Sequence, residues 1–254
     1  MIHHKNKTMD LRMPTSLKKC KIILILFLLA GSFVNAQKES QPRFLSVHTG
    51  IVTPFSAFSK NSLKNEAGFA ENGMNINLVY ARLIRKHLGI QYSLAYSGFG
   101  FDDAGCVDAY NEALNQSRGA EVAWHTNYQA YKGSIGLLAQ SPEILNTNLF
   151  VQAELGSALV LLPEIAVNNQ NWVIARIRQD DSGYITYGLG AGIKHLLGKK
   201  WGVILNYKVM RATPYFRMYN GHSSPRISIS SYYYSPYIIR MSWHSFNIGL
   251  LYKL

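Results

Sequence analysis

The sequence is poor in charged residues and in cysteine, and both scarcities narrow the class of protein. Only 16% of its 254 residues are charged, whereas 48% are hydrophobic, a balance that excludes a disordered chain. The chain has two cysteines, which excludes a fold held together by several disulfides. Cys20 precedes an apolar stretch that we expect to be removed, which leaves Cys106 as a free thiol in a polar segment.

Long hydrophobic runs are also lacking. The mean hydropathy of −0.04 argues against a bundle of membrane-spanning helices. The one long apolar run, 22–34, is too short for an ordinary spanning helix and is typical of an export signal. Basic residues precede this run: Arg12, Lys18, Lys19 and Lys21.

Small residues follow the apolar run, so we expect cleavage between Ala36 and Gln37. The sequence then predicts a signal peptide over 1–36 and a single domain over 37–254. The start of translation stays open among three methionines, Met1, Met9 and Met13.

The chain has an excess of positive charge, and export from the cytoplasm limits which partners this charge could bind. The whole chain has 26 Lys and Arg against 14 Asp and Glu, a net charge of +12. Residues 1–36 hold six basic residues and one acid, so residues 37–254 have 20 basic residues against 13 acids and a net charge of +7. An exported protein does not meet nucleic acid, so we expect membrane lipid and lipopolysaccharide phosphates as partners; the alternative is a solvated basic surface.

The chain is rich in segments where apolar and polar residues alternate, a pattern typical of β-strands. Eight segments show it: 44–52, 74–84, 88–97, 125–139, 149–159, 184–196, 201–210 and 237–254. The alternation breaks near Lys132 and near His244, which predicts a β-bulge at the first position and a parity slip at the second.

The connections between these segments alternate between long and short. The long ones are 55–73, 102–121, 163–182 and 213–236, and the short ones are 85–87, 141–148 and 198–200. An up-and-down barrel with both ends on one side of a membrane has this rhythm. We therefore predict an all-β fold, an eight-stranded antiparallel up-and-down transmembrane β-barrel with four long external loops and three short periplasmic turns.

The strands of a soluble secreted barrel would also alternate between apolar and polar residues, so alternation alone does not show which face points outward. The polar faces consist mostly of Gly, Ser, Asn, Ala and Thr, which suit a narrow filled interior better than a solvated exterior. The strands are long enough to cross a bilayer when tilted. Aromatic residues that suit membrane interfaces recur near strand ends: Tyr80, Tyr96, Trp124, Trp201, Tyr215, Trp243 and Tyr252.

The last eight residues, Asn247-Ile248-Gly249-Leu250-Leu251-Tyr252-Lys253-Leu254, carry the most specific pattern. They resemble the assembly signal of small outer-membrane β-barrels, the OmpA-transmembrane-domain-like or OmpW-like family, and differ from it in having Leu254 where the family has Phe. The resemblance covers 37–254. It implies the outer membrane of a Gram-negative bacterium and no cofactor. It also implies recognition by the barrel-assembly machinery through Asn247, Gly249, Tyr252 and Leu254.

The candidate site is a set of polar residues on the faces that should line the lumen: His48, Asn77, Gln91, Gln152, Glu154, Lys194, Asn206 and Lys208. A charge buried alone in a narrow barrel is costly, so we expect Glu154 to pair with Lys208 or Lys194. Such a network predicts a structural plug, with a gate for a small solute as the alternative.

Three surface features have weaker patterns. The Tyr- and Ser-rich segment 222–237 could contact a ligand or extend the strands. Basic residues lie in the short turns (Arg85, Lys86, Lys199, Lys200) and toward the long loops (Arg176, Arg178, Arg211, Arg217, Arg226), where arginine suits phosphate. The acids Asp102, Asp103 and Asp108 lack the regular spacing of a calcium site, so no metal is predicted.

We therefore expect a non-enzymatic protein with a structural or surface-interaction role and a plugged lumen. The alternative is a narrow porin-like conduit for small or apolar molecules. A third hypothesis is a lipid A-modifying enzyme, because related barrels use serine and histidine. Against it, His244 and Ser245 are adjacent on a strand and point to opposite faces, so no catalytic residues are predicted.

Overall fold

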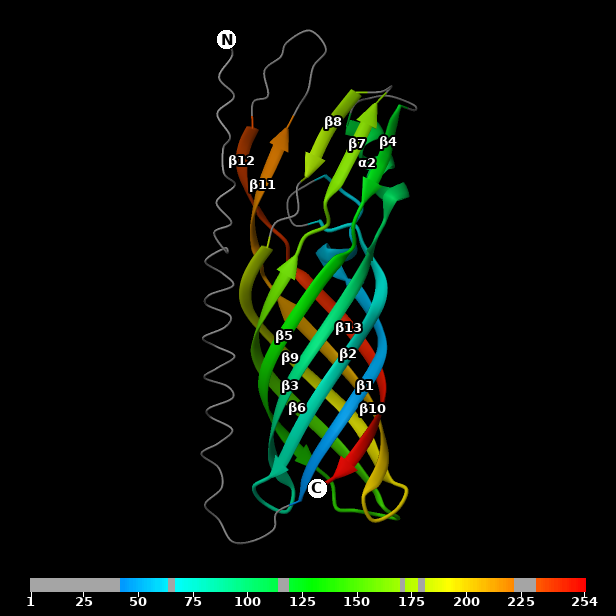
Figure 1. The fold of residues 1–254 in the computed structure, drawn as a ribbon, viewed down its shortest axis with the longest axis vertical. Helices are drawn as coiled ribbons and strands as arrows, with labels where there is room; N and C mark the ends of the chain where they lie inside the picture. The colour runs from blue at the N-terminus through cyan, green and yellow to red at the C-terminus, as the bar shows by residue number, and fades with distance from the viewer. Residues whose placement is uncertain (1–41, 64–66, 114–118, 170–171, 178–180, 222–231) are drawn as a thin grey trace, which may run out of the picture. The chain divides into compact units, whose positions relative to one another are not determined.

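The computed structural model describes residues 42–254, apart from 64–66, 114–118, 170–171, 178–180 and 222–231. Eight long antiparallel strands close into a barrel in the order β1-β13-β10-β9-β6-β5-β3-β2 (Figure 1). They are β1 Arg43–Phe55, β2 Ala70–Leu83, β3 Leu88–Phe101, β5 Tyr128–Gln140, β6 Thr147–Leu161, β9 Asp181–Leu196, β10 Trp201–Ala212 and β13 Met241–Lys253. The predicted eight-stranded up-and-down barrel is confirmed.

The first and last strands close the barrel by pairing along most of their length. The register runs from Phe44 opposite Lys253 to Phe55 opposite Ser242. Short turns join β2 to β3, β5 to β6 and β9 to β10 at the end where the chain terminates (Figure 1). We call this the short-turn end of the barrel, and the opposite end the long-loop end.

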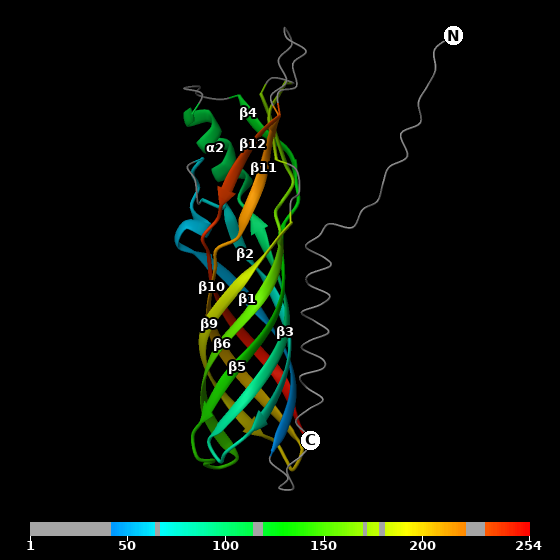
Figure 2. The same ribbon diagram turned by 90° about the vertical axis from the view of Figure 1, so that its left-hand side faces the viewer.

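The long connections are more ordered than the predicted loops. They hold a short 3-10 helix η1 (Ser56–Ser59), helix α2 (Asp103–Ala113) and strands β4 (Ala120–His125), β7 (Ile165–Asn169), β8 (Trp172–Ile177), β11 (Tyr215–Gly221) and β12 (Tyr232–Ile238). Strands β4, β7 and β8 form one sheet (Figure 1), and β11 pairs with β12 (Figure 2). Strand β4 lies in the connection between β3 and β5, whereas its partner β7 lies in the connection between β6 and β9. Because this pairing joins residues far apart in the sequence, the local sequence does not predict β4 as a strand.

Helix α2 begins where a side chain caps it. The backbone N–H of Gly105 donates to Asp102 Oδ1 at 2.8 Å, as expected of an N-cap aspartate. Asp102 Oδ2 also accepts from Asn61 Nδ2, which ties the helix to the first long connection. In the described part of the chain, no helix has both the length and the apolar character needed to cross a membrane.

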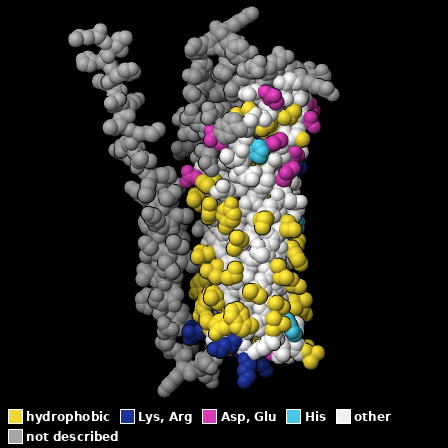
Figure 3. Space-filling view, turned by 45° about the vertical axis from the view of Figure 1, so that its right-hand side comes forward, with side chains coloured by type: hydrophobic (Ala, Val, Ile, Leu, Met, Phe, Trp, Pro, Cys, Tyr) yellow, Lys and Arg dark blue, Asp and Glu magenta, His cyan; other side chains and the backbone are white. Residues whose placement is uncertain are grey.

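Alternation along each strand separates an apolar outside from a filled inside. On β1, Val47 and Ile51 are 53% and 60% exposed, whereas His48 between them is 2% exposed. The same pattern around the barrel makes an apolar belt, seen as yellow side chains over the strands in Figure 3. In lipid, the backbone N–H and C=O groups of strands must be paired within the protein, and the surface that contacts the hydrocarbon must be apolar. A closed barrel with an apolar outer wall meets both requirements, so the barrel spans a membrane.

The predicted bulge near Lys132 and the predicted slip near His244 are both wrong. β5 pairs with β3 and β6, and β13 pairs with β1 and β10, without any register shift. Tyr128 and Trp243 keep the parity of the inward residues and are 3% and 4% exposed. Both predictions follow from placing every large apolar residue toward lipid, whereas these two residues fill the barrel interior at its long-loop end.

Candidate functional site: the barrel lumen

The inward side chains divide the lumen into three levels along its axis. An apolar layer lies at the long-loop end, and a second apolar layer lies at the short-turn end. Polar residues fill the level between them. The long-loop layer includes Val52, Phe99, Tyr128, Val160, Met210 and Trp243, and the short-turn layer includes Phe44, Leu83, Leu138, Phe150, Leu196, Ile204 and Leu251.

The polar level is centred on the carboxylate of Glu154 on β6. Lys132 Nζ donates to its Oε1 at 2.9 Å, and Lys208 Nζ lies 3.4 Å from the same oxygen. All three side chains are nearly fully buried, at 7% exposure or less. One carboxylate on β6 therefore joins ammonium groups from β5 and β10 across the lumen.

Two serine hydroxyls complete the shell around Glu154. Ser134 Oγ donates to Oε2 at 2.9 Å, and Ser93 Oγ lies 3.4 Å from the same atom. The two hydroxyls are 2.6 Å apart and bond to each other. Both carboxylate oxygens are thus engaged, which a buried charge requires if its desolvation is to be offset.

Glycines on β9 make room for these long inward side chains. A Cβ added to Gly190 would stand 2.9 Å from Gln152 Nε2 and 3.0 Å from Lys208 Cγ. A Cβ added to Gly192 would overlap the ring of Phe150. The inward glycines of β9 therefore leave the space that the large side chains of β6 and β10 occupy.

The other predicted lumen residues also point inward but do not form one continuous network. His48 Nε2 and Ser46 Oγ are 2.8 Å apart. Lys194 donates to Gln140 Oε1, and its Nζ lies 4.1 Å above the centre of the Phe44 ring, so it does not reach Glu154. Within the predicted set, four buried amides each have a side-chain atom without a hydrogen-bond partner among the described residues: Asn77, Gln91, Gln152 and Asn206.

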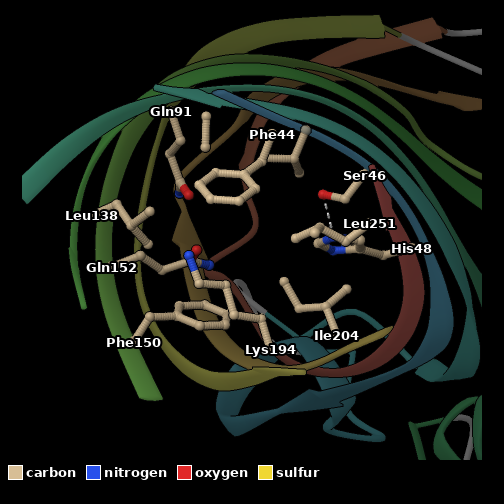
Figure 4. A pocket seen from close by; sticks show the side chains of 12 residues that line it. Phe44, Ser46, His48, Gln91, Leu138, Phe150, Gln152, Lys194, Ile204 and Leu251 are labelled. Carbon is tan, nitrogen blue, oxygen red and sulfur yellow. Dashed lines mark hydrogen bonds between the residues drawn. The ribbon is translucent and has the colours of Figure 1, made fainter. Parts of the chain in front are cut away.

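A small cavity lies between the polar level and the short-turn layer (Figure 4). Its volume is about 30 Å³, room for on the order of one or two water molecules. The amide ends of Gln91 and Gln152 point toward its centre, and the rings of Phe44 and Phe150 also line it. The cavity is a pocket inside a filled lumen.

Sequence reasoning missed Lys132, which makes the shortest ion pair with Glu154. The expected bulge hid it, because a bulge would have turned this part of β5 the other way. With unbroken alternation, Lys132 shares the inward parity of Tyr128 and Ser134. The two apolar layers were also missed, because residue type alone does not distinguish an apolar side chain that faces the lumen from one that faces lipid.

The other candidate residues lie as follows. Ser245 points inward at 2% exposure, whereas His244 points outward, hydrogen-bonds Tyr207 Oη and stacks on Phe55 with ring centroids 4.2 Å apart. In the assembly-signal segment, Asn247 is fully buried in the lumen, and Leu254 is 61% exposed. Gly249 lies opposite His48, and Tyr252 opposite Leu45.

Several expectations fall outside what the structure describes. They are the cleavage site at Ala36 and Gln37, most of segment 222–237, Arg178 and Arg226, and the side chains of Trp124, Arg176, Tyr215 and Arg217. Within the described part of the chain, no three His, Cys, Asp or Glu side chains are grouped closely enough to hold a metal ion.

Several solved structures resemble this chain. Neisserial surface protein A is 8% identical, with 84% of this chain and 97% of that chain covered and a TM-score of 0.45. Ail, the attachment invasion locus protein of Yersinia pestis, is 11% identical, with 85% and 100% covered and a TM-score of 0.45. A major outer membrane protein from Thermus thermophilus is 13% identical, with 84% and 99% covered and a TM-score of 0.49. No family model and no curated protein matches the chain.

Proposed function

We propose that the chain is a non-enzymatic outer-membrane protein of a Gram-negative bacterium, a closed barrel that holds an ordered surface extension. The apolar belt supports a membrane location, and the export signal expected over 1–36 supports the outer membrane. The ordered extension at the long-loop end, with its two small sheets and helix α2, is the part that could meet other molecules.

The observation that carries this proposal is the filled lumen. A conduit needs a continuous path, but two apolar layers cross the interior, and the polar level between them is tied by ion pairs. The cavity next to that level holds water-sized volume only. We therefore favour a structural and surface-interaction role over the narrow porin-like conduit.

The partners belong to the same proposal. Arg211 is exposed on the outer wall near the long-loop end, where it lies opposite Tyr187, a position suited to a lipopolysaccharide phosphate. The barrel-assembly machinery would read Asn247, Gly249, Tyr252 and Leu254. A ligand of segment 222–237 is the third proposed partner.

Planar-bilayer recording of the purified protein tests the closed lumen. We expect no steady conductance from the native chain. A variant with Phe99, Trp243 and Phe150 changed to Ala empties part of both apolar layers and should conduct, which shows that the assay detects an opened barrel. A reproducible solute-dependent current through the native protein would replace the closed barrel with the conduit.

Incubation with labelled lipopolysaccharide tests the non-enzymatic assignment. Ser245 and His244 face opposite sides of β13, so this pair cannot pass a proton between them. We expect the lipid to be recovered unchanged after incubation with membrane-inserted protein. Loss or transfer of an acyl chain would show that the protein is a lipid A-modifying enzyme.

A further inference from the structure

The buried charges of the lumen do not balance. Three lysines are buried among the described residues, Lys132, Lys194 and Lys208, whereas the buried acid in this part of the chain is Glu154 alone. Lys132 and Lys208 both approach Glu154, and Lys194 takes part in neither of these ion pairs. A buried ion without a counter-ion is costly, because it has lost its hydration. The interior therefore has more positive charge than its own carboxylate compensates.

Lys194 contacts neutral groups inside the barrel. Its Nζ donates to Gln140 Oε1 and lies 4.1 Å above the centre of the Phe44 ring. From the short-turn end, Glu143 attracts its charge and Lys253 repels it. Glu143 lies in an exposed turn, where water weakens the attraction, whereas Lys194 is 4% exposed. An anion next to this ammonium group would compensate its charge inside the lumen.

The cavity shown in Figure 4 is lined by Lys194 and by two amides that need a partner. Gln91 on β3 and Gln152 on β6 point their amide ends toward its centre, and Lys194 on β9 belongs to the same lining. The two glutamines are 3% and 6% exposed, and the Nε2 atoms of both are buried without a hydrogen-bond partner among the described residues. Buried N–H donors are normally paired, either with protein groups or with a bound molecule. Three strands therefore bring N–H donors to one small cavity.

The rest of the lining excludes a cation and any large ligand. Its described side chains include no carboxylate, and apart from Ser46 and His48, which hydrogen-bond to each other, they are apolar. The volume of about 30 Å³ suits one or two water molecules, so phosphates and carboxylic acids do not fit. A chloride ion is only slightly larger than a water molecule. Water would satisfy the amides but would leave the charge of Lys194 uncompensated, whereas chloride does both.

We propose that this cavity is a binding site for one chloride ion, held by the amide groups of Gln91 and Gln152 and by the ammonium group of Lys194. The ion gives both amides an acceptor and gives Lys194 a counter-ion between the polar level and the short-turn layer. Glu154 does the same for the other two buried lysines within the polar level. The lumen then has two centres of negative charge, one from the chain and one from the solvent. The site does not depend on the surface role proposed above.

Anomalous diffraction at long wavelength, from crystals of the native protein grown in sodium chloride, tests the site directly. Chloride scatters anomalously under these conditions, whereas the oxygen of water does so very weakly. We expect one anomalous peak in the cavity, within hydrogen-bond distance of both Nε2 atoms and of Lys194 Nζ. Density in the cavity without an anomalous signal would show that water fills it and would overturn the proposal.

Thermal unfolding in detergent micelles tests the site in solution, with sodium gluconate replaced by sodium chloride at constant ionic strength. Gluconate is too large for the cavity. A ligand that binds only the folded state stabilises it, so each tenfold increase in chloride above its Kd should raise the native midpoint by about 3–5 °C. Lys194→Met should reduce this rise to less than about 1 °C. Its midpoint in gluconate should stay close to the native one, because the charge that it removes is uncompensated there.

Lys132→Met is the matched control, because it removes a buried lysine that is paired with Glu154. It should lower the midpoint in both salts and keep the chloride-dependent rise. Q91M/Q152M removes both amide donors and keeps Lys194, and it should at least halve the rise. An undiminished rise in Lys194→Met would place the anion elsewhere and overturn the proposal. A steady current in the conductance assay would remove the closed lumen without changing the anomalous peak.

Discussion

At the scale of single residues, the interior depends on one acid. Glu154 is the sole carboxylate among the described buried side chains, and Lys132 and Lys208 both approach its Oε1. Five groups from four strands meet there when Ser93 and Ser134 are included. A shared counter-ion of this kind holds opposite walls of a narrow barrel together, because loss of the acid leaves two cations in low dielectric.

Replacing Glu154 by Gln should therefore destabilise the barrel strongly. Removal of one partner of a buried ion pair costs about 3–5 kcal/mol, because the remaining charge is left without compensation. Urea unfolding of the protein in lipid vesicles measures the change. Glu143→Gln, in an exposed turn, is the control and should alter the free energy of unfolding by less than about 0.5 kcal/mol. A similar value for both variants would show that the Glu154 centre does not stabilise the fold.

Cys106 makes a second prediction at this scale. Its thiol, on α2 outside the membrane, is 2% exposed, and burial, with Asp103 and Asp102 nearby, raises its pKa to about 12 from an ordinary value of 9.0. The raised pKa means that this group stabilises the fold fully below pH 9.0 and that the contribution is lost as pH rises toward 12. Iodoacetamide at pH 8 should label the native protein at least about tenfold more slowly than the urea-unfolded protein. Equal rates would show that α2 is open.

At the scale of elements, β9 is shaped by its neighbours. Its inward positions Gly188, Gly190 and Gly192 lie beside the long side chains of β6 and β10. The strand therefore has few inward side chains of its own in the middle of its length. Its place in the barrel is specified by what the adjacent strands project over it and by the register of 188–192 with 206–210 on β10.

Changing Gly192 to Leu should destabilise the barrel by about 1–3 kcal/mol, since the new side chain overlaps Phe150 in a filled interior. Gly183→Leu on the same strand is the matched control. A Cβ at Gly183 would meet no atom within 4 Å, and Gly183 is exposed. Thermal unfolding in detergent micelles measures both. If the two variants lose the same stability, the substitution acts through strand propensity and not through the lumen.

At the scale of the whole molecule, the outer wall divides into a lipid-facing belt and wet ends. Leu189 and Leu197 are both 67% exposed, but Leu189 lies within β9 and Leu197 lies in the turn after it. The two leucines are equally exposed, but Leu189 contacts lipid and Leu197 contacts water. The difference depends on position along the barrel axis, which neither the residue type nor its exposed fraction indicates.

This pair gives the fourth prediction. Leu189→Arg should cost about 2–4 kcal/mol of stability in vesicles, as expected for a cation moved into the hydrocarbon, and Leu197→Arg about 0–1 kcal/mol. Guanidinium unfolding in phospholipid vesicles measures both changes. Equal costs would contradict the placement of the belt in the membrane.

Much of the architecture could be predicted because strand alternation is local. The eight segments, the inward position of Glu154 and Lys208, and the three turns follow from residues close together in sequence. Helix α2 and strand β4 could not be predicted in the same way, because they are specified by a cap from Asp102 and by pairing with β7. Tyr128 and Trp243 were placed wrongly because parity alone does not tell lipid from a packed interior.

By itself, the sequence determined the number of barrel strands, their alternation and the rhythm of long and short connections, since each depends on neighbours along the chain. The tertiary structure decided which cation meets Glu154, that apolar layers fill both ends of the lumen, and that Gln91 and Lys194 line one cavity. The physical reason is closure. Once β1 pairs with β13, residues from distant strands share one narrow interior, and their chemistry depends on register across the barrel.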